Sequence, residues 1–180
     1  MPAKAWNIRP AAIHDARAIA EVHVESYKST YRGILPDEFL DGLSVEKRES
    51  FWRDLLAAQQ SITIVGCGAD GSVLGFASGG KERSGRLGCD GELYAIYLHT
   101  EAQRKGLGAF LVRQMVQELV ALGFRSMAVW VLARNPSTKF YESLGGRVIG
   151  QQEIERGGQT FSEVAYGWPG LDAFRESRNN

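Results

Sequence analysis

A short polar run containing two glycines is the part of the sequence best suited to chemistry. It reads Gln103-Arg104-Lys105-Gly106-Leu107-Gly108 and separates an apolar run from a long amphipathic segment. Glycines let a backbone approach a ligand closely, because no Cβ stands in the way. A helix that begins here leaves its first N–H groups without intrahelical partners, and its dipole favours an anion at this end. With Arg104 and Lys105 beside it, the run predicts a site for a pyrophosphate.

Two familiar phosphate-binding loops do not match this run. A P-loop requires GxxxxGK[ST], a pattern that the sequence does not contain. A dinucleotide-binding fingerprint requires GxGxxG after the first strand of a βαβ unit. Here the run has only Gly106-x-Gly108, and the strand expected before it lies in the middle of the chain.

The elements that would position this run follow from the periodicity of the sequence. Apolar residues dominate 92–99 and predict a central strand. Helical spacing over 106–122 predicts a long helix that Gly123 ends. Asn135 followed by proline predicts a helix over 136–144 with Asn135 as its N-cap. We also expect strands at 6–9, 61–67, 73–79, 126–132, 147–155 and 160–168, a helix opening at His14-Asp15, a short helix at 36–40, and a helix at 45–58 capped by Ser44.

The bulk composition limits the class of protein. The chain has 180 residues, which fits one domain over 1–180, with a core at about 6–168 and a loose polar tail from 173. Its 21 basic and 21 acidic side chains balance, which argues against a dedicated nucleic-acid binder. Two well-separated cysteines form no metal-binding pattern and favour a reducing compartment. No apolar run approaches the roughly 20 residues of a membrane span, and the start lacks a secretion signal, so we expect a cytoplasmic protein.

The glycine-containing run resembles a signature of a known enzyme family. Gln103-x-x-Gly106-x-Gly108 is similar to the acyl-CoA signature, Gln/Arg-x-x-Gly-x-Gly/Ala, of the GCN5-related N-acetyltransferase (GNAT) superfamily. The segment 92–98 resembles that family's fourth strand, and 130–146 resembles its next motif. The resemblance implies a mixed α/β fold with a mostly antiparallel, twisted sheet of six to seven strands. Helices would cover both faces, and strands four and five would splay apart.

The resemblance also implies how a donor, acetyl-CoA, is held, without any metal. The pantetheine arm would pair with backbone groups of the fourth strand, as an added strand does. Gln103 would close the loop through its side chain, and Asn135 would touch the pantetheine arm. Phe140 is either a ligand contact or a core residue. The expected donor-binding residues are Ile96, Tyr97, Leu98, Gln103, Arg104, Lys105, Gly106, Leu107, Gly108, Ala109, Asn135 and Phe140.

Acyl transfer to an amine requires a base and a way to stabilise the leaving thiolate. By resemblance, Tyr141 is the expected general acid; the alternative is a tyrosine that packs or orders the sulfur. Glu92 is the expected base, acting through a water; the alternative is a solvent-facing carboxylate at the strand end. Tyr94 falls on the same strand face as Glu92 and would line the acceptor pocket. Tyr27 and Tyr31 would wall that pocket or belong to the core.

Nothing in the sequence names the acceptor, which is expected to be a primary amine of a small molecule or a peptide. His14, His23 and His99 lack the partner spacing of a nucleophilic triad, so we expect direct transfer without an acyl-enzyme. The alternative function is a non-catalytic module that binds acyl-CoA. A homodimer is compatible with the family resemblance, but no feature of the sequence decides it.

Overall fold

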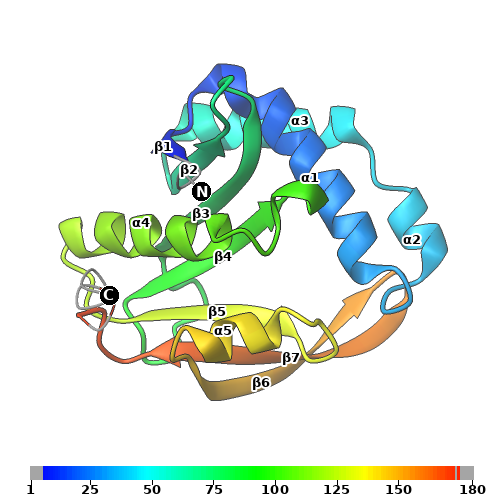
Figure 1. Cartoon of the computed structure of the whole chain (residues 1–180). Coiled ribbons are helices and arrows are strands. Elements are labelled where there is room, and N and C mark those ends of the chain that lie inside the picture. The colour runs from blue at the N-terminus through cyan, green and yellow to red at the C-terminus, as the bar shows by residue number, and fades with distance from the viewer. Residues whose placement is uncertain (1–5, 173, 175–180) are drawn as a thin grey trace.

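A computed structural model describes residues 6–172 and 174. Its strands form one seven-stranded sheet in the order β1-β2-β3-β4-β5-β7-β6 (Figure 1). The β4–β5 pair is parallel, and every other neighbouring pair is antiparallel. The strands are β1 (Asn7–Pro10), β2 (Ile62–Cys67), β3 (Val73–Lys81), β4 (Gly91–Leu98), β5 (Met127–Leu132), β6 (Arg147–Arg156) and β7 (Gln159–Trp168). The α-helices are α1 (Ala16–Tyr31), α2 (Asp37–Asp41), α3 (Val45–Ala58), α4 (Leu107–Ala121) and α5 (Thr138–Ser143), and 3-10 turns cover Ile13–Asp15 and Thr100–Ala102.

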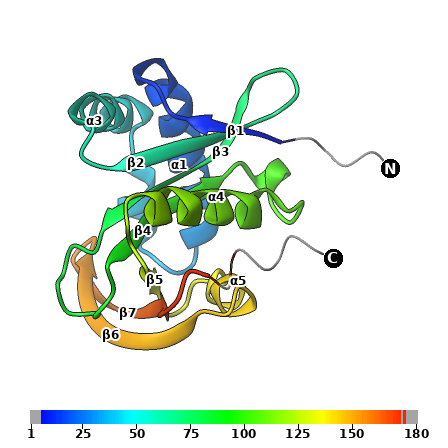
Figure 2. The same cartoon turned by 90° about the vertical axis from the view of Figure 1, so that its left-hand side faces the viewer.

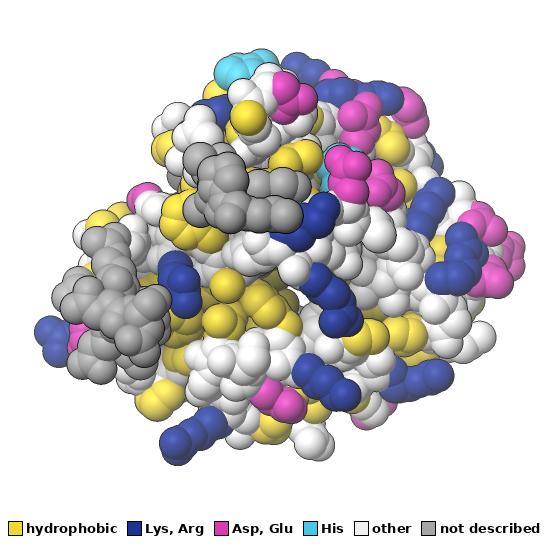
Figure 3. All heavy atoms as spheres, in the orientation of Figure 1, with side chains coloured by type: hydrophobic (Ala, Val, Ile, Leu, Met, Phe, Trp, Pro, Cys, Tyr) yellow, Lys and Arg dark blue, Asp and Glu magenta, His cyan; other side chains and the backbone are white. Residues whose placement is uncertain are grey.

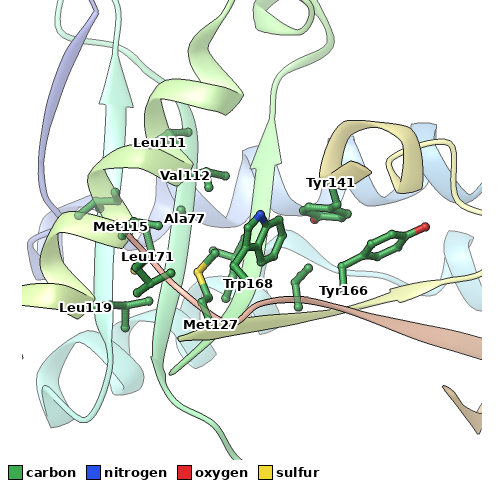
Figure 4. Close-up of a cluster of buried hydrophobic side chains, with 14 of the residues drawn as sticks. Ala77, Leu111, Val112, Met115, Leu119, Met127, Tyr141, Tyr166, Trp168 and Leu171 are labelled. Atoms are coloured by element: carbon green, nitrogen blue, oxygen red, sulfur yellow. The ribbon is translucent and has the colours of Figure 1, made fainter. Parts of the chain in front are cut away.

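Helices cover both faces of the sheet, as expected. Figure 2 shows α1 and α3 on one face and α4 and α5 on the other. Trp52 of α3 and Phe76 of β3 belong to the cluster that α1 and α3 form on the first face. On the second face, the apolar stripe of α4 packs against residues of β5 and β7 such as Met127 and Trp168 (Figure 4). These two cores fix the sheet between its helical layers, because burying both apolar faces favours a single arrangement.

Local signals explain most element boundaries. Helix α3 begins where Ser44 caps it, since Lys47 N–H donates to Ser44 Oγ over 3.3 Å. Asp15 is no side-chain cap for α1; its carboxylate binds Arg9 and the N–H of Ala12 instead. The expected start of α5 was two residues early, because the carbonyl oxygen of the Asn135 side chain accepts the N–H of Ser137 and holds 136–137 as a turn.

Strands β4 and β5 separate along their length. They pair over three positions, from Gly91 opposite Met127 to Leu93 opposite Val129. At the next residue, Tyr94, β4 carries an extra residue relative to β3, because the register shifts between Ser78 and Gly79. Such a bulge bends a strand and increases its local twist. The splayed sheet that the family resemblance implied is therefore present, and it opens where β4 bends.

Among the described residues, no helix is long and apolar enough to cross a membrane. Cys67 and Cys89 are free thiols. The tail 173–180, which the composition predicts to be loose, lies outside the described residues except for Phe174.

Candidate active site

The start of α4 presents a row of backbone N–H groups beside the split in the sheet. Gly106 stands before the helix with a φ of 94°, and Arg104 has a φ of 55°. The first intrahelical bond runs from Phe110 N–H to Gly106. Within 6–172 and 174, no acceptor is bonded to the N–H groups of 104–109. Consecutive free donors at a helix N-terminus, with two exposed cationic side chains, are an arrangement that favours an anion, and a pyrophosphate site here stays a prediction.

Gln103 joins this loop to the end of β4. Its side-chain N–H donates to the carbonyl of Leu98 over 3.2 Å. His99 N–H donates to the carbonyl of Leu74 in β3 over 2.9 Å. In an antiparallel pair, every second residue directs its backbone groups to the partner strand, so those of Ile96 and Leu98 point away from β3. Those groups face the split. Tyr97, which the sequence places in the same set, directs its backbone groups toward β3 by the same alternation.

Four tyrosines from three elements gather where the sheet opens: Tyr27 and Tyr31 of α1, Tyr97 of β4 and Tyr141 of α5. The rings of Tyr27 and Tyr31 lie 4.3 Å apart, and those of Tyr27 and Tyr97 lie 5.9 Å apart. Burial, and then the neighbouring Tyr27, raise the pKa of Tyr31 to about 12. Burial, followed by the influence of Tyr31, also raises the pKa of Tyr97. All of these phenols are therefore protonated at neutral pH.

Tyr141 supplies an available hydroxyl at the split. The residue is 6% exposed, and burial followed by the neighbouring Tyr31 raises its pKa. Its hydroxyl has no hydrogen-bond partner among the described residues. It is also not completely buried, because Ser61 Oγ is the only side-chain N or O atom of the described residues that is both fully shielded and without a partner. The Tyr141 hydroxyl is therefore a neutral, unpartnered donor that is not completely shielded from solvent. This is the state that a general acid requires.

Asn135 and Phe140 lie close to this site but are used within the protein. The Asn135 amide donates to the Tyr31 hydroxyl over 3.0 Å, in addition to its bond from Ser137, and the side chain is buried. These bonds are all within the protein, so a contact between Asn135 and the pantetheine arm stays a prediction. Phe140 packs against the core, and a Cβ added at Gly108 would lie 3.5 Å from its ring. Figure 3 shows apolar side chains gathered in the opening between α4 and α5, with Lys and Arg side chains around them.

A pocket of about 480 Å³ lies on the other face of the sheet, against α1 and α3. All three residues expected at the acceptor site, Tyr27, Tyr31 and Tyr94, line it. Tyr97 lines it as well, and so do Leu93 and Val131, which belong to the core on the face that carries α4. The remaining lining residues are Arg48, Arg83, Glu92, Trp130, Leu132, Gln152, Ile154, Arg156 and Glu163.

Glu92 is buried at this pocket and is held by one arginine. Its side chain is 2% exposed, and both of its oxygens accept hydrogen bonds from the Arg83 guanidinium. The Arg83 backbone N–H adds a third bond of 3.0 Å. The same guanidinium lies 4.1 Å from the centre of the Tyr94 ring, which places Glu92 and Tyr94 on the same side of β4 as expected. Glu92 is thus not solvent-facing, and both of its oxygens are engaged by Arg83.

Comparison with known proteins agrees with this geometry. A sequence model described as FR47-like protein matches residues 86–155, which contain β4, the loop and α5. The chain is 40% identical over 175 residues to the N-acetyltransferase YuaI of Bacillus subtilis, itself described as uncharacterized, and the match covers 96% of this chain and 98% of that protein. The chain belongs to the GCN5-related N-acetyltransferase superfamily.

Other acetyltransferases show the breadth of this superfamily. A spermidine N(1)-acetyltransferase of Thermoplasma acidophilum is 27% identical, over 79% of this chain and 88% of that protein. Among solved structures, the PaiA N-acetyltransferase of Thermoplasma acidophilum in complex with coenzyme A has a TM-score of 0.68 and 23% identity, covering 88% of this chain and 98% of that one. A phosphinothricin acetyltransferase of Sinorhizobium meliloti in complex with AcCoA has a TM-score of 0.70 and 23% identity, covering 93% and 89%. These two structures support the fold.

In this acetyltransferase, sequence reasoning missed one group of pocket residues. Arg48 lies on α3, Arg83 in the loop after β3, and Arg156 at the end of β6. No local motif marks them, because they come together only when the sheet forms. Arg83 and Arg156 lie beside exposed turns and Arg48 lies in the first turn of α3, positions that an ordinary surface arginine also occupies.

Proposed function

We propose that this protein transfers an acetyl group from acetyl-CoA to the primary amine of a small molecule, by direct attack within a ternary complex. The observation that carries the proposal is the split between β4 and β5. It brings the free N–H groups at the start of α4 together with an aromatic pocket on the opposite face. A donor held along one side and an amine entering from the other side would meet at the tyrosine cluster.

The donor fits the groups that line the split. The backbone groups of Ile96 and the N–H of Leu98, which face away from β3, suit the amides of a pantetheine arm, which would extend β4 as an added strand. The N–H groups at 104–109, with Arg104 and Lys105, suit a pyrophosphate. The N–H of Leu98 or Ile96 would donate to the oxygen that becomes negative as the amine attacks.

The proton steps are assigned to two residues. An aliphatic amine is mostly protonated at neutral pH, since its pKa is near that of lysine, about 10.4. Glu92 would accept that proton through a water once the Arg83 pair opens. Tyr141 would donate a hydrogen bond to the departing sulfur. A thiol has a pKa of about 8.5, below that of the phenol, so stabilising the thiolate by this bond is sufficient.

The test is titration of the protein with acetyl-CoA, CoA and ATP, followed by an assay of thiol release with a panel of primary amines. We expect tight binding of acetyl-CoA and CoA, weak binding of ATP, and thiol release that depends on an amine. If acetyl-CoA binds but no amine in the panel causes thiol release, the protein is a non-catalytic module instead. Tight ATP binding without CoA binding would overturn the proposal entirely.

A further inference from the structure

The charged residues of the acceptor pocket are not balanced. Arg48, Arg83 and Arg156 line it together with Glu92 and Glu163. Arg83 and Glu92 neutralise each other through their ion pair. Two arginines and one carboxylate remain to interact with whatever enters. The pocket therefore carries a net positive charge at neutral pH.

Neither remaining arginine has a carboxylate partner within 4 Å among residues 6–172 and 174. The Arg48 guanidinium lies 5.5 Å from the centre of the Phe51 ring, and Arg156 donates to the carbonyl of Glu155 over 2.8 Å. Arg156 is exposed and Arg48 is half-buried. Each guanidinium carries five N–H donors in a planar fork, so these contacts leave most of them available for a bidentate anion.

The two arginines act on the same point of the pocket although they come from different parts of the fold. Arg48 lies on α3 and Arg156 at the end of β6, yet the positive charges of both oppose the effect of burial on the pKa of Tyr27. Glu163 acts on Tyr27 in the opposite direction and also on Tyr31. Because all four residues line the same pocket, a small molecule bound beside Tyr27 would be near two cations and one anion.

Glu163 is the one carboxylate of the pocket that is not in an ion pair. Its Oε2 accepts a hydrogen bond of 2.8 Å from the side chain of Gln152, which leaves its negative charge uncompensated. One carboxylate suits one ammonium group. A polyamine carries several ammonium groups, and each additional one would lie near Arg48 or Arg156, whose like charge would repel it.

From this arrangement we infer that the acceptor is a small amine that also carries an anionic group, such as a carboxylate or phosphonate, which Arg48 and Arg156 bind together. The inference rests on the proposed function and names its substrate class. Carboxylates and phosphonates both present two anionic oxygens on one atom, which a guanidinium fork can bind through two parallel hydrogen bonds. The aromatic walls formed by Tyr27, Tyr94 and Trp130 suit a short apolar linker between the two charged ends.

The test compares acceptors that differ at one end only. γ-Aminobutyrate, putrescine and butylamine have the same length and end in a carboxylate, an ammonium and a methyl group. Aminopropylphosphonate replaces the carboxylate by a phosphonate, and leucine with leucinamide repeats the comparison for an α-amino acid. We expect kcat/KM to be highest for an acidic member of each set and lowest for putrescine. Each value is measured by thiol release from acetyl-CoA.

Two variants test the assigned arginines. In R48Q and R156Q, the ratio of kcat/KM for the preferred acidic amine to that for its neutral analogue should fall about tenfold to a hundredfold, mainly through KM. R53Q, on α3 but paired with Glu49 outside the pocket, and R147Q, at the exposed start of β6, are the matched controls and should keep the wild-type ratio.

The outcomes separate this inference from the proposed function. Faster turnover of putrescine than of every acidic amine, or an unchanged ratio in both pocket variants, overturns the inference while the acetyltransferase proposal stands. If no amine causes thiol release from acetyl-CoA, calorimetric titration of the acidic amines into the CoA-bound protein decides the substrate class. Binding that is lost in R48Q supports it, and absence of binding to the wild-type protein overturns it.

Discussion

The side-chain amide of Asn135 donates a hydrogen bond of 3.0 Å to the hydroxyl of Tyr31, and this bond joins the turn before α5 to the end of α1 across the split sheet. Both side chains are buried, at 5% and 7% exposure. A buried polar group that loses its partner incurs a desolvation penalty. The bond therefore helps to hold the two sides of the opening at a fixed separation.

Removing this bond should destabilise the protein without affecting distant elements. We expect Tyr31→Phe and Asn135→Ala each to lower the free energy of unfolding by about 1 to 3 kcal/mol. The double variant should lose less than the sum, because both changes break the same bond. Urea denaturation measures all three, and Tyr94→Phe, whose exposed hydroxyl bonds the Lys81 carbonyl, serves as a comparison. Strictly additive losses would contradict a shared interaction.

Gly106→Ala tests the anion site at the start of α4. An alanine at a φ of 94° strains the backbone and reorients the N–H groups that follow, so CoA affinity should fall by tenfold or more, about 1.4 kcal/mol. Gly71→Ala is a matched control, because Gly71 has a φ of 84° and open space around it, but lies in the β2–β3 turn. Calorimetry should show wild-type CoA affinity for Gly71→Ala. Equal affinity losses in the two variants would assign the effect to strain alone.

Tyr141→Phe tests the assignment of the general acid. Loss of the hydroxyl should reduce kcat by about tenfold to a thousandfold and leave CoA affinity nearly unchanged. Tyr166→Phe is the control, since its ring lies 6.0 Å from that of Tyr141 but its hydroxyl bonds Glu142. Pre-steady-state thiol release would separate chemistry from product release. A Tyr141→Phe enzyme with unchanged kcat would leave Tyr141 as a packing residue.

The Glu92–Arg83 pair allows the base to be tested in two ways. Glu92→Gln should lower kcat by about a hundredfold or more, because the amide cannot take the proton. Arg83→Gln frees the carboxylate but leaves it buried, so we expect a loss of stability of about 1 to 3 kcal/mol and a smaller loss of kcat. Urea denaturation and steady-state kinetics measure the two effects, and equal losses of kcat in both variants would assign the pair to structure.

His23 predicts a loss of stability in acid. Burial, followed by the nearby Arg48, lowers its pKa from 6.5 to about 3. The unfolded chain therefore binds a proton that the folded protein excludes, and stability is lost as the pH falls below about 6.5, by up to about 1.4 kcal/mol per pH unit. His23→Asn, which keeps an acceptor for the indole N–H of Trp52, should remove this contribution in urea titrations from neutral pH to pH of about 4.5. His14→Gln, at an exposed position, should retain it.

Much of the fold was predictable because its signals are local. Ser44 marks the start of α3, and the apolar run of β4 identified the central strand, because capping and periodicity depend on neighbours in sequence. The free N–H groups at the start of α4 were predictable for the same reason. The splayed sheet came from family resemblance rather than from periodicity. The bulge at Tyr94 that accompanies it has no sequence signal of its own.

The charges of the pocket could not be predicted, because they depend on contacts between distant segments. Glu92 looked like a solvent-facing or catalytic carboxylate, and only the path of the loop after β3 brings Arg83 onto it. The approach of Arg48 and Arg156 to Tyr27 requires that α3, α1 and β6 be in place. Asn135 was predicted to be the N-cap of α5, but the N-cap is Ser137, whose N–H donates to the Asn135 side chain. The bond from Asn135 to Tyr31 had no sequence signal, because it spans 104 positions in the chain.

The three-residue pairing between β4 and β5 also has a consequence for how such a protein can change its substrate. Most of the groups expected to hold the donor, at Leu98 and 104–109, lie on the β4 side of that seam. The acceptor pocket takes walls from both sides, and Arg156 and Glu163 belong to the β6–β7 hairpin across the seam. The hairpin can therefore change in sequence without altering the groups expected to hold the donor. Substitutions there should alter which amine is accepted while the cofactor contacts stay as they are.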